Sequence, residues 1–305
     1  MFQKVAGIRR YAFVPVEQCE MCGSAAHRVL GLRLNRSQGL NPAGRTGIAV
    51  GVKRCRDCGL TFADPRPIPG AIEDHYGVPP EGYWSPKRFE PDPSYFQREI
   101  AEAKRLLPFQ EGMSALDIGA GFGKAMTALS AAGFDTWGLE PSEPFRDRAI
   151  EKMGIPADRL ALSTVEAFNP VVGFDFITFG AVLEHLQEPA RALERAMAWL
   201  KPGGIIQAEV PSSDWLVSKL VNGFFRLRGT NYVTNLSPMH SPFHLYEFGL
   251  KSFQAHAAKA GYEIAHHHYM VCSIPHVPKP LKPLLREVMA RTNTGMQLVV
   301  YLKRS

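Results

Sequence analysis

The sequence predicts an α/β protein with a doubly wound, mostly parallel sheet and a small metal-binding domain ahead of it. Two observations predict this arrangement. Beyond about residue 112, short apolar segments alternate with longer segments that end at glycine, the order expected of strands and helices in a parallel sheet. Before that point stand two Cys-x-x-Cys pairs, each followed by glycine, which is a spacing typical of a metal site.

Length and composition agree with this division. The chain has 305 residues, of which 45% are hydrophobic and 21% charged, the usual balance of a folded globular protein. We therefore expect a metal-binding domain at 1–75, a connector with one helix at 76–110, and an α/β domain at 111–305.

Charge and hydropathy limit the setting in which the chain works. The N-terminal residues lead into no apolar core of a signal peptide, and no apolar run approaches a membrane span, so we expect a cytoplasmic protein. Residues 1–75 hold 11 basic and 6 acidic residues, which accounts for most of the formal net charge of +6. Such a stretch is either a solvated surface or a patch for phosphate groups.

Four cysteines form the predicted metal site. Cys19 and Cys22 make one pair, and Cys55 and Cys58 make the other, 32 residues further on. Four thiolates without histidine close a tetrahedral site, which predicts structural zinc in a zinc-ribbon domain. The remaining cysteine, Cys272, is expected to be an isolated buried side chain.

The connector contains many prolines, and a helix is expected after it over residues 94–107. Ser94 is a candidate N-cap, and Phe96, Ile100, Ala103 and Leu107 fall on one face. In the α/β domain, strands are expected at 115–118, 136–139, 174–179 and 205–210, and helices at 124–132, 143–153 and 189–200. The last strands are expected at 263–269 and 296–302.

A glycine-rich turn follows the first of these strands. Gly119, Gly121 and Gly123 let a ligand approach the backbone closely. The dinucleotide fingerprint would require glycine at position 124, which is Lys124, so a nicotinamide cofactor is disfavoured. Glu140 ends the second strand, where its carboxylate can accept hydrogen bonds from both hydroxyls of a ribose.

Five ordered segments resemble the motifs of class I S-adenosylmethionine-dependent methyltransferases: LDIGAGFG at 116–123, GLEPS at 138–142, FDFI at 174–177, AVLEHL at 181–186 and LKPGG at 200–204. The resemblance implies a seven-stranded, Rossmann-like methyltransferase fold that binds S-adenosylmethionine. It places the methionine part and ribose over the turn that contains Ala120, with Asp117 positioning that end. It places Pro141, Thr164 and Val165 around the adenine, and the carbonyl of Gly180 at the methionine ammonium.

The first quarter is similar to zinc-binding heads of bacterial methyltransferases. The stretch CRDCGLTFADPRP at 55–67, followed by His75 and Tyr76, carries this resemblance. Such heads occur in methyltransferases of antibiotic sugars and surface polysaccharides, which implies a hydroxylated small molecule, a sugar or glycan, as methyl acceptor.

A hydroxyl acceptor benefits from a general base, and histidines are the candidates. His185 follows the fourth strand, near the expected position of the methyl group, and either acts as the base or shapes its loop. His244 and His240 lie beyond the fifth strand and either contact the substrate or anchor their loop. Three consecutive histidines at 266–268 alternate faces on a strand, which argues against their chelating a single metal ion.

Three alternatives stay open at this stage. Segment 215–228 is an apolar helix with a basic end, which serves as a lid, as part of the core or as a membrane contact. The chain methylates either a small molecule or RNA held by the basic head, although the Asn/Asp-Pro-Pro-Tyr/Phe motif of base-amine methyltransferases is replaced by Gly180-Ala181-Val182-Leu183. A non-catalytic module that retains the cofactor pocket is the third.

Overall fold

The structure is a computed structural model. It describes residues 2–5, 9–36, 45–70, 92, 94–272, 274 and 277–304. His75, Tyr76 and the prolines between 71 and 91 lie outside the described residues.

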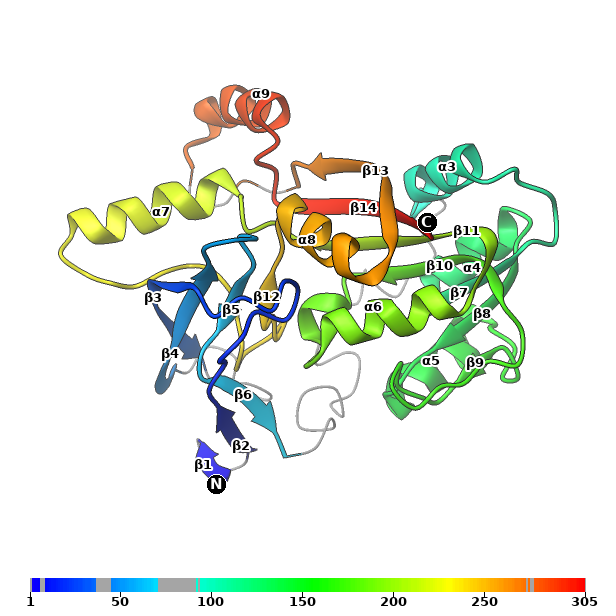
Figure 1. Ribbon diagram of the computed structural model, residues 1–305, viewed down its shortest axis with the longest axis horizontal. Helices are drawn as coiled ribbons and strands as arrows, with labels where there is room; N and C mark the ends of the chain where they lie inside the picture. The colour runs from blue at the N-terminus through cyan, green and yellow to red at the C-terminus, as the bar shows by residue number, and fades with distance from the viewer. Residues whose placement is uncertain are drawn as a thin grey trace.

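A seven-stranded sheet forms the centre of the α/β part (Figure 1). Its strand order is β13-β14-β11-β10-β7-β8-β9, with every pairing parallel except those that β14 makes with its two neighbours. This confirms the doubly wound, mostly parallel sheet. The strands are β7 (Ser114–Ile118), β8 (Asp135–Leu139), β9 (Leu160–Ala161), β10 (Phe174–Gly180), β11 (Leu200–Pro211), β13 (Tyr262–Met270) and β14 (Gln297–Arg304).

Helices cover both faces of this sheet because successive strand residues point to opposite sides. Leu116, Ile177 and Ile206 pack with α6 (Pro189–Ala198) and α8 (Leu250–Ala260). Their neighbours Ala115 and Phe176 pack on the other side. There they meet α3 (Gln97–Leu106) and α4 (Lys124–Ala131), while α5 (Glu143–Met153) packs against β9 and the start of α4.

Most predicted helix ends are confirmed. Gly133 (φ 92°) follows α4 and Gly154 (φ 68°) caps α5, as the glycine positions predict. The buried face of α3 is also the predicted one. The expected N-cap at Ser94 is wrong: α3 begins at Gln97, and the hydroxyl of Ser94 donates a hydrogen bond to Asp92 instead.

The N-terminal part forms two small sheets. One has the order β1-β2-β6 and the other the order β12-β5-β4-β3. These strands are β1 (Phe2–Val5), β2 (Arg9–Val14), β3 (His27–Arg36), β4 (Arg45–Cys55), β5 (Thr61–Ala63), β6 (Arg66–Pro69) and β12 (Tyr246–Glu247).

The α/β part completes one of these sheets, because β12 lies far along the chain and pairs with β5. Arg66 adds a second connection: its Nη1 donates to the carbonyl oxygen of Gln187 and to the hydroxyl of Tyr246, each at 2.5 Å. The four-cysteine part is therefore joined to the α/β part by strand pairing and side-chain hydrogen bonds. Its predicted boundary at residue 75 lies outside the described residues.

Along the chain, helix α7 (Leu216–Leu227) follows β11, and α9 (Lys282–Thr292) comes after β13 and before β14 (Figure 1). The histidines at 266–268 lie on β13, as expected of a strand. Cys272 comes directly after that strand and is exposed, so the expectation of a buried thiol is wrong. No helix within the described ranges is long and apolar enough to cross a membrane.

Candidate active site

The glycine turn lies between β7 and α4 and is packed too tightly for larger residues. A Cβ on Gly119 would lie 2.6 Å from Cγ2 of Val182, and one on Gly123 would lie 2.8 Å from Cγ1 of Ile155. Both glycines have positive φ, 70° and 74°, which side chains rarely adopt. Packing and backbone conformation therefore both require glycine at 119 and 123, and the approach of a ligand to this turn stays a prediction from the sequence.

Glu140 is fixed beside this turn by two backbone hydrogen bonds. Its Oε2 accepts from the amide of Gly121, and its Oε1 from the amide of Ser142, both at 2.8 Å. A carboxylate offers about four lone-pair directions, so two remain for a ligand. Two free acceptor directions are the number that a pair of vicinal hydroxyls requires.

Two buried carboxyl groups make this end of the sheet receptive to positive charge. Burial and the nearby charge of Glu140 raise the pKa of Asp117 to about 8. Burial raises the pKa of Glu140 to about 7, although its two amide hydrogen bonds lower it. A cationic ligand would stabilise the ionised form of both groups.

The other expected cofactor residues lie at the same edge of the sheet. Gly180 is the last residue of β10, and Thr164 and Val165 follow β9. Ala120 is tied to the second strand, because its amide donates to the carbonyl oxygen of Leu139 at 2.8 Å. The carboxyl ends of parallel strands are where ligands bind in such sheets.

A second group of polar side chains follows β10. Glu184 and His185 lie in the short helix η2 (Leu183–His185), and His244 lies just before β12. The Nε2 atom of His244 is 3.7 Å from Oε1 of Glu184, and that of His185 is 4.0 Å from the same oxygen. Neither oxygen of Glu184 has a hydrogen-bond partner in the described structure, although the side chain is fully buried.

Burial keeps this group uncharged at neutral pH. It raises the pKa of Glu184 to about 8 and lowers that of His185 to about 4. The pKa of His244 is also well below its usual value, because the ring is buried and faces the charges of His185 and His240. A buried neutral imidazole beside a carboxyl group can accept a proton, and the spacing of the three donor atoms, all within 4.8 Å of one another, also suits a divalent cation.

Val182 lies between the glycine turn and the group of Glu184, His185 and His244. This residue packs against Gly119 of the turn and lies two positions before Glu184. The carboxyl end of β10 therefore brings the second group next to the place where a ligand would cross the glycine turn.

His240 has different surroundings. Its Nδ1 lies 3.3 Å from Oδ1 of Asn35, and its Nε2 lies 3.3 Å from an Nη2 of Arg33. Both ring nitrogens are thus engaged by strand β3. The structure brings together His185 and His244, whose ring centroids are 5.0 Å apart, while His240 ties its loop to the four-cysteine part.

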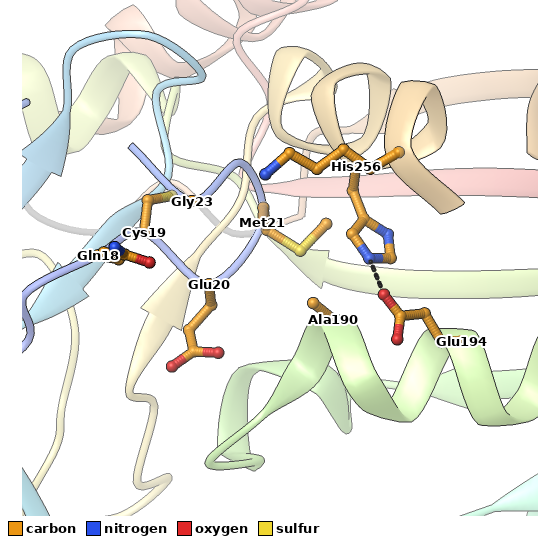
Figure 2. A pocket seen from close by; sticks show the side chains of 9 residues that line it. Gln18, Cys19, Glu20, Met21, Gly23, Ala190, Glu194 and His256 are labelled. Atoms are coloured by element: carbon orange, nitrogen blue, oxygen red, sulfur yellow. Dashed lines mark hydrogen bonds and ion pairs between the residues drawn. The ribbon is translucent and has the colours of Figure 1, made fainter. Parts of the chain in front are cut away.

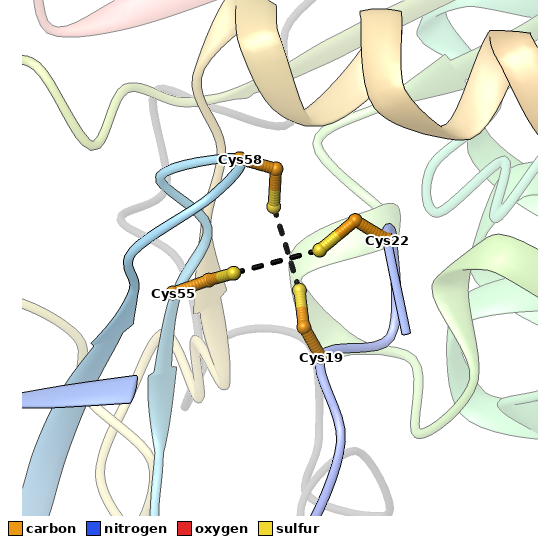
Figure 3. Close-up of side chains that lie close together, drawn as sticks. All are labelled: Cys19, Cys22, Cys55 and Cys58. Atoms are coloured by element: carbon orange, nitrogen blue, oxygen red, sulfur yellow. Dashed lines mark hydrogen bonds between the residues drawn. The ribbon is translucent and has the colours of Figure 1, made fainter. Parts of the chain in front are cut away.

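The four predicted metal ligands converge in the N-terminal part (Figure 3). Sulfur atoms of Cys19 and Cys58 lie 3.5 Å apart, as do those of Cys22 and Cys55. A tetrahedral zinc site with bonds of about 2.3 Å requires separations of about 3.8 Å, so the arrangement fits zinc closely.

A cavity of about 340 Å³ lies beside this cysteine site, between residues 18–23 and helices α6 and α8 (Figure 2). Its polar wall is made by Glu194 and His256, whose Oε1 and Nε2 atoms are 3.3 Å apart. No residue of the glycine turn lines it, so it is separate from the candidate active site.

Part of the basic excess near the N-terminus is used within the protein. Lys53 pairs with Asp64, Arg54 with Asp214 at 2.9 Å, and Arg66 with Glu20 at 2.9 Å. Asp64 and Glu20 are already among the six acidic residues counted in 1–75, so only the pair with Asp214 lowers the basic excess of this part.

Sequence reasoning missed the role of Glu184. The residue stands in the segment AVLEHL, directly before His185. Its burial comes from the tertiary structure, and the sequence carries no signal for it.

Comparison with known proteins agrees with the geometry. A family described as "Methyltransferase domain" matches residues 94–267, more than half of the chain. The ubiquinone biosynthesis O-methyltransferase of Paramagnetospirillum magneticum is 31% identical over 143 residues, covering 41% of this chain and 56% of that protein. The trans-aconitate 2-methyltransferase of Methylobacterium radiotolerans is 31% identical over 136 residues, covering 43% of this chain and 50% of that protein. The chain thus spans about half the length of these curated relatives.

A solved structure shares the fold. The cyclopropane synthase MmaA2 from Mycobacterium tuberculosis superposes with a TM-score of 0.50 at 18% identity, over 76% of this chain and 97% of that one. At this identity the likeness concerns the fold alone.

Proposed function

The chain belongs to the S-adenosylmethionine-dependent methyltransferases, and we propose that it methylates a hydroxyl oxygen of a small molecule. The observation that carries this proposal is the buried group of Glu184, His185 and His244 beside the glycine turn. A methyl transfer to oxygen has to dispose of one proton, and this group offers two imidazoles beside Glu184, which closely follows Val182, the residue that packs against the turn.

The cofactor residues are assigned by their position around the turn. S-adenosylmethionine supplies a methyl group on a positively charged sulfur, which needs no further activation. Glu140 holds the ribose hydroxyls with its two remaining lone-pair directions. Asp117 and the carbonyl of Gly180 hold the methionine end, and Pro141, Thr164 and Val165 flank the adenine. The main task of these residues is to align the methyl group with the acceptor.

His244 is assigned as the general base. No hydrogen bond within the described residues engages its ring nitrogens, and its Nε2 faces Glu184 at 3.7 Å. The proton of the acceptor hydroxyl passes to this ring as the oxygen attacks. Above about pH 8, where Glu184 is ionised, its carboxylate stabilises the imidazolium. His185 supports the same pocket, because its Nδ1 lies 3.3 Å from the carbonyl oxygen of Phe243.

The weak basicity of the site favours an acidic hydroxyl. The lowered pKa values of His185 and His244 suit an acceptor such as a phenol, with a pKa of about 10, better than a sugar hydroxyl. One of the two reported relatives is named an O-methyltransferase of ubiquinone biosynthesis, which supports an oxygen acceptor; the other is named a trans-aconitate 2-methyltransferase. We therefore rank a phenolic acceptor ahead of the sugar or glycan expected from the zinc-binding head.

Zinc in the four-cysteine site is proposed to be structural. Four thiolates leave no open coordination position for a substrate, and three of the sulfur-bearing residues are buried.

The test is methyl transfer from labelled S-adenosylmethionine to matched panels of phenols and sugars. We expect label in the phenol panel as a methyl ether, at a rate that falls about 10²–10⁴-fold in the variant His244→Ala, as removal of a general base does. Label on nitrogen or carbon, or an unchanged rate in that variant, would contradict the assignment.

A further inference from the structure

Helices α7 and α9 expose an unusual amount of apolar surface. Leu220, Phe224 and Leu227 of α7 are 55%, 55% and 89% exposed. Leu281, just before α9, and Leu284 of that helix are 53% and 66% exposed. With Val288, they make up six of the thirteen strongly exposed large hydrophobic side chains of the described residues.

The exposed side chains fall on one face of each helix. The α7 positions are spaced by four and three residues, and positions 284 and 288 of α9 by four, which places each set along one side. The opposite faces are buried: Ser218 and Asn222 of α7 are 4% and 9% exposed, and Met289 of α9 is fully buried. Val217 and Met289 belong to one buried cluster that joins the two helices. The exposed faces are therefore outer surfaces of folded helices, at the end of the molecule where α7 and α9 lie (Figure 1).

Positive charge accompanies this apolar surface. Residues 215–228 contain three basic side chains and no acidic one. Residues 277–292 contain four basic side chains and one acidic one, Glu287, which pairs with Arg291 at 2.7 Å. The basic residues are Lys219, Arg226, Arg228, Lys279, Lys282, Arg286 and Arg291. Asp214, directly before the first segment, pairs with Lys219 at 3.1 Å. Seven basic and two acidic residues therefore give the two segments and Asp214 a net charge of +5.

We propose that the outer faces of α7 and α9 bind the surface of an anionic lipid bilayer. Apolar side chains at the centre of a helix face with Lys and Arg around them are the features of a helix that lies in the plane of a membrane interface. A second copy of the chain is a poorer occupant, because two such positive surfaces would repel each other. This proposal is independent of the assigned methyl acceptor.

The membrane contact explains why α7 serves two of the roles that the sequence left open. Its inner face is core, since Asn222 donates to Oδ1 of Asn235 at 2.7 Å and accepts from the amide of Thr234. Its outer face has no cover among the described residues. The core and membrane interpretations therefore apply to opposite sides of one helix.

The test is co-sedimentation of the full chain with phosphatidylcholine vesicles, with and without phosphatidylglycerol. We expect binding to the anionic vesicles that weakens as salt is added, because surface charges are screened. Replacing one apolar side chain on each helix, Phe224→Ser with Leu284→Ser, should weaken binding about tenfold, from the apolar area no longer inserted.

A matched control removes two exposed apolar side chains elsewhere. Leu162→Ser with Val171→Ser, at positions 49% and 99% exposed, should leave binding unchanged. The charge reversals Arg228→Glu and Lys279→Glu provide a second variant whose core is untouched, and they should abolish the preference for anionic vesicles. Absence of wild-type binding at low salt, equal effects of control and test variants, or a dimer in light scattering that the Ser variants dissociate would overturn the proposal.

Discussion

Replacing Glu140 by glutamine should weaken cofactor binding, and the hydrogen bonds of Glu140 allow the size of the effect on Kd to be calculated. The carboxylate accepts the amides of Gly121 and Ser142 through different oxygens, at 2.8 Å each. Glutamine keeps one oxygen and turns an NH₂ group toward the other amide, so one donor faces another donor. One of the two ribose hydroxyls also loses its charged acceptor.

The magnitude follows from the value of such a bond. A hydrogen bond to a charged group is worth about 1.5–3 kcal/mol, so the Kd for S-adenosylmethionine should rise about 10–150-fold. The unmatched amide costs a further ~1–3 kcal/mol of stability, which lowers Tm by about 2–5 °C in a chain of this length.

Isothermal titration calorimetry with S-adenosylhomocysteine measures the effect without turnover. Glu143→Gln is the matched control, because Glu143 is an exposed carboxylate in the first turn of α5 and should leave Kd unchanged. A folded Glu140→Gln protein that binds within about threefold of wild type would refute the assignment of this carboxylate to the ribose.

Three further predictions concern protons and metal. Ionised Glu184 makes His244 a stronger base, so kcat/KM of the wild-type protein should rise with pH through about pH 8. A Glu184→Gln variant that keeps this rise would contradict the assignment of Glu184 as the group that supports His244. Asp117 and Glu184 keep their protons up to about pH 8 in the folded state, whereas the unfolded chain releases them near pH 4. The free energy of unfolding of the ligand-free protein should therefore fall as pH rises from about 4 to about 8. A Tm that increases over this range would contradict this prediction. Cys55→Ser should lose the zinc, about one ion per chain by mass spectrometry, whereas Cys272→Ser should keep it; equal zinc contents would argue against the four-cysteine site.

Local patterns predicted most of the α/β part. Strands β7 and β10 are short and mostly apolar, and helices α4 and α5 are followed by positions of positive φ, which glycine accommodates best. These signals lie within a few residues of the structure that they determine. The same holds for the metal site, where each pair of cysteines carries its own tight turn.

Features that depend on distant contacts were not predictable. Strand β12 has two residues and no pattern of its own, and it exists because β5 offers an unpaired edge. His240 resembled a catalytic candidate from its neighbours, but its ring contacts Asn35, which is 205 residues away in the sequence. Ser94 illustrates a local competition, in which Asp92 binds the hydroxyl that was expected to cap a helix.

The most direct test of the central claim is a crystal structure of the chain with S-adenosylhomocysteine. The account predicts that both ribose hydroxyls lie about 3 Å from the carboxylate of Glu140 and that the sulfur points toward the pocket of Glu184 and His244. Clear density for the nucleoside anywhere other than across the turn at 119–123, or an empty turn at saturating ligand, would contradict it.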